Sequence, residues 1–281
     1  MKFLSKRPHT LLYVPDGVSH GECRATHLCV AAHQDDVEIM AYAPIAECYD
    51  CGQKHFMAVT LTDGGGSPRT GRFARCTDEE MIRLRMGEQQ KAAELGRYCA
   101  LAMLGHTSNA VKGGDPAVTE ELAELLLRVR PQILYTHNLA DKHDTHVATA
   151  LRTVEALRLI RSDYRPERVY MMEVWRGLDW LCEEDKALFD TSPRPQLAAD
   201  LLDVFESQIE GGKSYRSAAL GRRIANATFF ESHRVDGGSS LSYGLDATDF
   251  VYSPQTPQEF IGQCIARFRE DVQSRLERLI P

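Results

Sequence analysis

The sequence predicts an α/β fold with a Rossmann-like, mostly parallel sheet, helices on both faces and an elaborated C-terminal region. Short apolar segments at residues 27–32, 56–62, 101–104 and 133–136 alternate with segments of helical spacing, which is typical of repeated βαβ units. Right-handed crossovers then make these strands parallel. From the length of 281 residues we expect one domain over residues 1–281, with an α/β core at about 25–180 and a C-terminal elaboration at about 181–281.

The composition argues against two classes of partner. The chain has 33 basic and 40 acidic residues, a net charge of −7 and no Lys/Arg-rich run, so we do not expect it to bind nucleic acid. No segment approaches the ~20 apolar residues of a membrane span, and the N-terminus lacks the apolar stretch of a signal peptide. We therefore expect a soluble, cytoplasmic protein with no membrane partner.

The first elements along the chain follow from apolar runs and turn residues. Residues 11–14 are expected to form an edge strand or an ordered arm. Residues 27–32 predict a buried strand, and residues 37–48 a helix directly after it. Polar, metal-competent side chains, His33, Asp35 and Asp36, stand at this strand-to-helix turn, where α/β sheets usually bind ligands. The alternative is that an aspartate only caps the helix.

A glycine-rich loop, residues 63–68, follows the strand at 56–62. It has neither the GxGxxG spacing nor a GK[ST] sequence, so it predicts no dinucleotide or P-loop site. We interpret it as a loop on the rim of the active site, with Gly64 as a candidate substrate-binding residue; a plain connecting loop is almost as good an interpretation.

The next elements are a long helix, a strand, a second helix and another strand. Thr77 and Glu80 have the spacing of a capping box, which places the start of the first helix, and Gly96 ends it. A strand at 101–104 precedes apolar residues at helical spacing, and that second helix ends at Pro131.

A second polar cluster, residues 137–146, follows the strand at 133–136. His146 opens a helix and His143 lies in the loop before it, so both imidazoles can face the carboxyl edge of the sheet. Two imidazoles and one carboxylate are a common catalytic zinc set, with a fourth position open for water. The alternative is a polar loop whose histidines and aspartates only cap the helix.

Beyond residue 165 the pattern is weaker. Residues 168–175 predict a strand, and residues 201–223 predict a mostly helical segment. The last segment is a strongly amphipathic helix, whose apolar side chains must cover either the core or a partner subunit. A homo-oligomer is therefore one expectation. The apolar positions are Phe260, Ile261, Cys264, Ile265, Phe268, Val272, Leu276 and Ile280.

Three motifs in order resemble the LmbE-like or PIG-L family of metal-dependent N-deacetylases, over roughly residues 27–160. Ala32-His33-Gln34-Asp35-Asp36 resembles the family's (A/P)HPDD motif, with Gln34 in place of proline. Arg85, Glu88, Ala92, Leu95 and Gly96 match its RxxExxxAxxLG helix, and residues 141–146 resemble its DxHPDH segment, with Asp144-Thr145 in place of Pro-Asp.

The resemblance implies a single LmbE-like domain in which His33, Asp36 and His146 bind the metal. It implies Asp35 as general base for a metal-activated water and His143 as the acid or oxyanion stabiliser. Arg85 is a candidate substrate-side residue, although a surface arginine paired with Glu88 is as good an interpretation. Asp141 is a candidate substrate-binding residue or a partner that orients a histidine.

The implied function is removal of an acyl group, most simply acetyl, from the amide nitrogen of an N-acetylated amino sugar or related glycoconjugate. The expected cofactor is Zn²⁺, with Fe²⁺ as the alternative, and the expected partner is a small N-acylated molecule. The competing hypotheses are an inactive metal- or sugar-binding homologue and an amidase that acts on a non-sugar amide. A serine hydrolase is disfavoured because the chain has no GxSxG motif.

Overall fold

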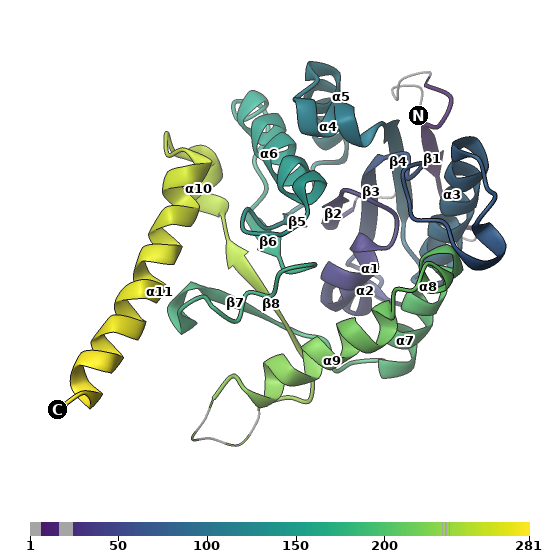
Figure 1. Cartoon of the computed structure of the whole chain (residues 1–281). Helices are drawn as coiled ribbons and strands as arrows, with labels where there is room; N and C mark the ends of the chain where they lie inside the picture. The colour runs from purple at the N-terminus through teal and green to yellow at the C-terminus, as the bar shows by residue number, and fades with distance from the viewer. Residues whose placement is uncertain (1–6, 17–24, 232, 234, 236) are drawn as a thin grey trace.

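The computed structural model describes residues 7–16, 25–231, 233, 235 and 237–281, and its central feature is an eight-stranded sheet (Figure 1). The strand order is β1-β4-β3-β2-β5-β6-β8-β7. The five strands from β4 to β6 are mutually parallel, whereas β1 and β8 run antiparallel to their neighbours β4 and β6, and β7 runs antiparallel to β8. The predicted α/β fold with a mostly parallel sheet is confirmed. The strands are β1 (Leu11–Tyr13), β2 (His27–Ala31), β3 (Phe56–Thr62), β4 (Ala100–His106), β5 (Ile133–His137), β6 (Arg168–Met172), β7 (Lys186–Asp190) and β8 (Leu241–Asp246).

Helices cover both faces of the sheet. Successive side chains of β2 alternate between the faces, so Leu28 and Val30 join one apolar core and Cys29 and Ala31 the other. Residues of α5 and α6 complete the first core, and residues of α1, α2, α3 and α7 complete the second. The helices are α1 (Asp36–Met40), α2 (Tyr42–Cys48), α3 (Asp78–Leu95), α4 (Ser108–Gly113), α5 (Pro116–Val129), α6 (Asp144–Leu159), α7 (Pro195–Asp203), α8 (Glu206–Glu210), α9 (Tyr215–Thr228), α10 (Thr248–Tyr252) and α11 (Pro257–Leu279).

The local predictions in the N-terminal half hold closely. The capping box of Thr77 and Glu80 is present at the start of α3, and Gly96 is its C-cap. The short strand β1 lies at an edge of the sheet, paired with β4. The helix predicted over 37–48 is interrupted at Ala41, which divides it into α1 and α2.

Residues 201–223 are mostly helical, as the sequence predicts, but they do not form a continuous helix. The chain forms the end of α7, the short helix α8 and the first part of α9, separated by turns. The strand expected over 168–175 ends at Met172, and two further strands, β7 and β8, extend the sheet beyond it. The C-terminal region therefore adds strands to the sheet as well as helices.

Among the described residues, no helix combines the length and the apolar character that crossing a bilayer requires.

Candidate metal centre and active-site pocket

The two polar clusters meet at the carboxyl ends of β2 and β5. These strands are adjacent and parallel, and the chain leaves β2 toward β3 on one side but reaches β5 on the other. Such a reversal of strand order opens a crevice where α/β proteins bind ligands. His33 follows β2, whereas His143 and His146 lie at the start of α6.

A tight turn positions the residues after β2. Asp36 is the first residue of α1, and its Oδ2 accepts a hydrogen bond from the backbone N–H of His33 at 2.8 Å. Asp35 has a φ of 94°, a left-handed conformation that is uncommon for a residue other than glycine. Its side chain makes no capping hydrogen bond to α1, so helix capping does not account for Asp35.

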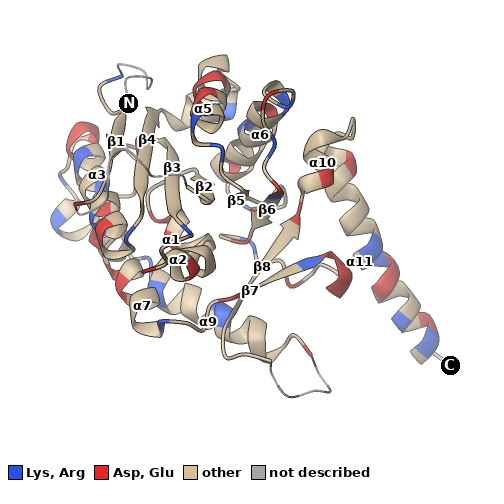
Figure 2. Ribbon diagram, turned by 180° about the vertical axis from the view of Figure 1, so that it is seen from behind, with Lys and Arg blue, Asp and Glu red and all other residues tan. Residues whose placement is uncertain are grey.

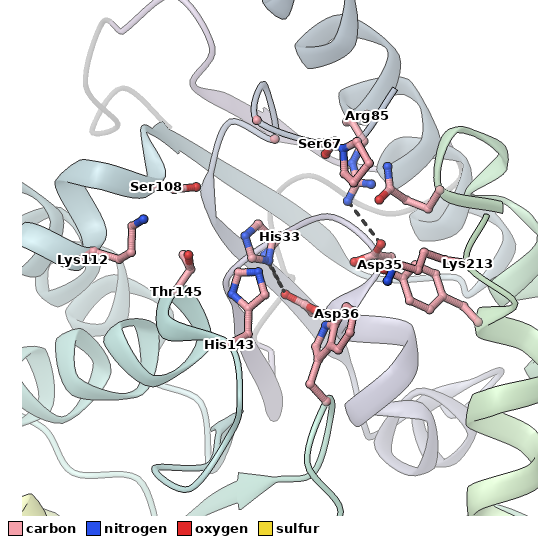
Figure 3. Close-up of a pocket in the computed structure, with 16 residues that line it drawn as sticks. His33, Asp35, Asp36, Ser67, Arg85, Ser108, Lys112, His143, Thr145 and Lys213 are labelled. Atoms are coloured by element: carbon pink, nitrogen blue, oxygen red, sulfur yellow. Dashed lines mark hydrogen bonds and ion pairs between the residues drawn. The ribbon is translucent and has the colours of Figure 1, made fainter. Parts of the chain in front are cut away.

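Three side chains form a candidate metal site: His33, Asp36 and His146. One ligand atom from each lies within 4.8 Å of the others. His33 Nδ1 is 3.1 Å from Asp36 Oδ2 (Figure 3). On the other side of this carboxylate, His146 Nε2 is 3.2 Å from Asp36 Oδ1. The His146 side chain is fully buried, yet neither ring nitrogen makes a hydrogen bond to any described residue. A divalent cation held with Asp36 would satisfy His146 Nε2, while Nδ1 faces Asp141, so this donor set fits a metal.

A second group, His137, Asp141 and His146, has similar spacing but is less suited to a metal. His137 Nε2 already accepts a hydrogen bond from the backbone N–H of Ala32 at 2.9 Å. The His137 ring stacks on that of His146, with centroids 4.0 Å apart. His137 therefore supports a ligand. The sequence placed it in the second cluster but gave it no role.

The charges in the site reinforce one another. Burial alone would raise the pKa of Asp36, but His146 and His137 outweigh it and hold that pKa well below its usual range. Burial alone would lower the pKa of His146, but Asp36 and Asp141 raise it to about 10. Without a metal, His146 is thus an imidazolium between two carboxylates, and a bound cation would take the place of its proton.

Asp35 lies beside the donor set without belonging to it. The residue is buried, and its Oδ2 is 3.3 Å from an Nη of Arg85. Burial and, to a smaller extent, the neighbouring Asp36 raise the pKa of Asp35 to about 7 against the opposing effect of Arg85. Arg85 is itself buried and also donates to the backbone carbonyl of Gln34. The interpretation of Arg85 as a surface residue paired with Glu88 is therefore wrong.

These side chains open into a cavity of about 470 Å³ (Figure 3). Of the residues predicted from the sequence, six line it: His33, Asp35, Asp36, Gly64, Arg85 and His143. His146 and Asp141 lie behind this surface. The other lining residues, which sequence reasoning missed, include Ser67, Ser108, Lys112, Thr145, Trp175, Gln208, Lys213 and Tyr215.

Gly64 lines the cavity, and the buried Gln34 packs directly against it. Gly64 has a φ of +79°, and a Cβ added there would lie 2.5 Å from Gln34 Oε1. Gln34 Nε2 in turn donates to the backbone carbonyl of Thr62 at 3.2 Å. Gln34, which stands where the family motif has proline, is thus packed in place and hydrogen-bonded to the end of β3. Its side chain lies so close to position 64 that only glycine fits there.

Asp141 organises the histidine segment. Its Oδ1 accepts from the backbone N–H of His143 at 3.0 Å, its Oδ2 accepts from that of Trp175 at 3.1 Å, and Oδ2 is 3.6 Å from His146 Nδ1. Burial, His146 and His33 lower the pKa of His143, so its ring is neutral and keeps one N–H to donate.

Comparisons with known proteins are consistent with this arrangement. Residues 28–157 match the family model of PIG-L, described as GlcNAc-PI de-N-acetylase. This range contains the three motifs from which the sequence predicts the family, and that prediction is confirmed. Among curated proteins, no sequence matches the chain.

Solved structures share the fold at low identity. The conserved protein TT1542 from Thermus thermophilus is 19% identical, with a TM-score of 0.64 over 83% of this chain and 99% of that one. The N,N'-diacetylchitobiose deacetylase from Pyrococcus horikoshii is 15% identical, with a TM-score of 0.66 over 82% and 86%. GalB, the 4-carboxy-2-hydroxymuconate hydratase from Pseudomonas putida KT2440, is 18% identical, with a TM-score of 0.59 over 83% and 98%. Because a deacetylase and a hydratase share this fold, the activity has to be argued from the site.

Proposed function

We propose that this chain, which is PIG-L-like over residues 28–157, is a metal-dependent hydrolase that removes the acetyl group from an N-acetylated amino sugar. One observation carries the proposal: the metal-competent set of His33, Asp36 and His146 opens into the same cavity as the unligated carboxyl of Asp35 and the neutral ring of His143. Amide hydrolysis needs a base for water and a donor for the carbonyl oxygen, and these two residues can supply them.

We assign the metal ligands to His33, Asp36 and His146. Zn²⁺ is the first choice for two imidazoles and one carboxylate, and Fe²⁺ suits the same set. When bound, the cation would supply Lewis-acid activation of water and of the amide carbonyl. Asp141 holds the backbone before His146 and so orients this ligand.

We assign proton transfer to Asp35 and stabilisation of the developing oxyanion to His143. Asp35 accepts a proton from the attacking water as the water oxygen bonds to the acyl carbon. The N–H of His143 donates to the carbonyl oxygen, where negative charge develops. As the C–N bond breaks, Asp35 returns its proton to the departing amine. Arg85 fixes the Asp35 carboxyl through their ion pair.

The cavity lining supports a sugar as substrate. Trp175 and Tyr215 provide aromatic faces, with ring centroids 6.5 Å apart, and Lys213 Nζ lies 4.8 Å from the centroid of the Trp175 ring. Ser67 and Ser108 line the cavity on the side away from Lys213 and offer hydroxyl partners (Figure 3). The family description and the chitobiose deacetylase support an N-acetylated amino sugar in particular.

The experiment measures metal content together with acetate release from a panel of N-acetylated sugars. The wild type is expected to hold about one metal per chain and to release acetate. His146→Ala should lose both, whereas Asp35→Asn should keep the metal and lose turnover by about a hundredfold or more, the usual range for a general base. Asp144→Asn is the matched control, because Asp144 is exposed and does not line the cavity.

Each contrary result has a definite meaning. Full turnover by Asp35→Asn would refute the role of Asp35. Metal binding by the wild type without release from any sugar or non-sugar amide would favour a binding protein. A wild type without metal would refute the ligand assignment.

A further inference from the structure

The C-terminal helix α11 extends away from the body of the protein (Figure 1). Of its described residues only Cys264 is fully buried. Arg267 fixes the first half of the helix through hydrogen bonds of 2.7 and 2.8 Å to Asp185, and Phe268 lies against Trp180 with ring centroids 6.3 Å apart. The second half projects beyond these contacts.

From its middle to its end, α11 exposes a narrow apolar stripe, which we define as Ile265, Phe268, Val272, Leu276 and Leu279. Their exposed fractions are 52, 39, 40, 53 and 69%. Separations of three and four residues place all five on one side of the helix. The sequence predicts that the apolar side of this helix covers the core or a partner. Phe260, Ile261 and Cys264 do pack on the core, whereas the residues of the stripe stay exposed. A contiguous exposed apolar surface of this kind is typical of an interaction site.

The stripe is symmetric about Val272. Phe268 and Leu276 lie four positions before and after it, and Ile265 and Leu279 lie seven positions before and after it. A twofold interface must be self-complementary, because both subunits present the same surface. If two copies of α11 pack antiparallel with the axis at Val272, each remaining apolar residue of the stripe meets an apolar residue of the other copy.

We propose that the stripe packs against the same stripe of a second copy of this chain, antiparallel and centred on Val272. Charge is compatible with this contact, because α11 carries residues of both signs (Figure 2). Asp271 and Arg275 flank the stripe as an ion pair with a 3.2 Å separation, and each copy would contribute one such neutral pair to the edge of the interface. The body of each subunit lies at the first half of its helix. The antiparallel arrangement places the two bodies at opposite ends of the helix pair, whereas a parallel pair would force them side by side.

The first test is the molecular mass of the full-length protein by analytical ultracentrifugation over a range of concentrations. The wild type is expected to be a dimer that dissociates on dilution. Val272→Glu should raise the dissociation constant about a hundredfold or more, because it loses an apolar contact and places two buried like charges at the axis. Gln263→Glu is the matched control, since Gln263 is exposed and lies nine positions before Val272, about 180° around the helix, so that the same charge stands opposite the stripe and should leave dimerisation unchanged. Both variants should keep the wild-type activity, because α11 contributes nothing to the cavity, and should keep the wild-type melting temperature at a dilution where the wild type is monomeric.

The second test determines the orientation by disulfide cross-linking. A mixture of Ile265→Cys and Leu279→Cys chains should give a mixed disulfide dimer that neither variant gives alone, with the wild type as the control for native cysteines. Cross-linking of each variant with itself would indicate a parallel pair and overturn the proposal. A wild type that stays monomeric at every concentration would overturn it as well, and would leave the stripe to a different partner.

Discussion

Replacement of Glu88 by alanine should destabilise the protein and weaken substrate binding, because Glu88 attaches α8 to α3. Its Oε1 accepts from the backbone N–H of Ser207 and its Oε2 from the Ser207 hydroxyl, both at 2.7 Å, and the site is buried. The next residue, Gln208, lines the cavity. The glutamate of the RxxE motif thus positions part of the cavity wall, whereas its arginine lines the cavity.

The magnitude follows from these two hydrogen bonds. A hydrogen bond to a charged group contributes about 1.5–3 kcal/mol, and alanine would leave both Ser207 donors buried without an acceptor. The loss is reduced because the substitution also removes a carboxyl whose pKa burial raises. We expect Glu88→Ala to lower the free energy of unfolding by about 2–4 kcal/mol, measured by urea denaturation, and to raise KM more than it lowers kcat.

Glu88→Gln separates hydrogen bonding from charge. The glutamine oxygen can accept from the Ser207 N–H while its NH₂ donates to the Ser207 hydroxyl oxygen, which can also act as an acceptor. We therefore expect Glu88→Gln to lower the free energy of unfolding by less than about 1 kcal/mol. The reasoning is refuted if Glu88→Ala also lowers the free energy of unfolding by less than about 1 kcal/mol, or if Glu88→Gln lowers it as much as Glu88→Ala.

Three further predictions concern the site and its support. Gly64→Ala should lower the free energy of unfolding by about 1–3 kcal/mol, because its Cβ would collide with Gln34 Oε1 and its φ is positive. Gly66→Ala is the control: no atom lies within 4 Å of an added Cβ there, so the melting temperature should not change. Arg223→Met should lower the free energy of unfolding by about 2–4 kcal/mol and weaken metal binding, because the buried arginine donates at 2.8 and 3.0 Å to two carbonyls of α1. An unchanged metal affinity would contradict the inference that Arg223 supports α1. Zn²⁺ at a hundred times its dissociation constant should raise the free energy of unfolding of the wild type by about 2.7 kcal/mol, measured by calorimetry. A chelator should abolish this stabilisation, and His146→Ala should not show it.

The sequence was most informative for the parallel part of the sheet. Strands such as β2 and β3 are buried on both faces, so they occur as continuous apolar runs with little ambiguity. The helix after them is equally well marked, because its capping box is local in sequence.

The C-terminal strands depend on contacts that no local pattern shows. β7 lies at the edge of the sheet with half-exposed side chains, and Gly244 in β8 fits closely between Met172 and Phe189. Residues 201–223 are mostly helical, but turns before and after α8 divide them, and Ser207 of α8 is held by Glu88 of α3. Tertiary contact therefore overrode local propensity in this region.

The candidate site likewise has one part that the local sequence predicts and one part that it does not. Residues such as His33 and His143 follow strands directly, so their convergence could be predicted from strand order alone. Trp175, Lys213 and Tyr215 reach the cavity from the C-terminal region, and nothing in their local sequence distinguishes them from ordinary surface residues. Asp141 lies behind a ligand and not in the cavity, because its two oxygens are already engaged by backbone N–H groups.

The pairing of β2 with β5 also determines when the metal site can form during folding. The two strands contribute opposite halves of the site, and Ala32 bonds directly to His137 across 105 positions of sequence. Closing so long a loop is slow relative to forming local helices and hairpins. Under the proposed ligand assignment, a metal would consequently have no assembled site in the early collapsed chain and could not serve as a template for the first steps. The visible absorption of Co²⁺, used as a substitute ion, would appear only in the last kinetic phase and would report the moment at which the two halves of the sheet join.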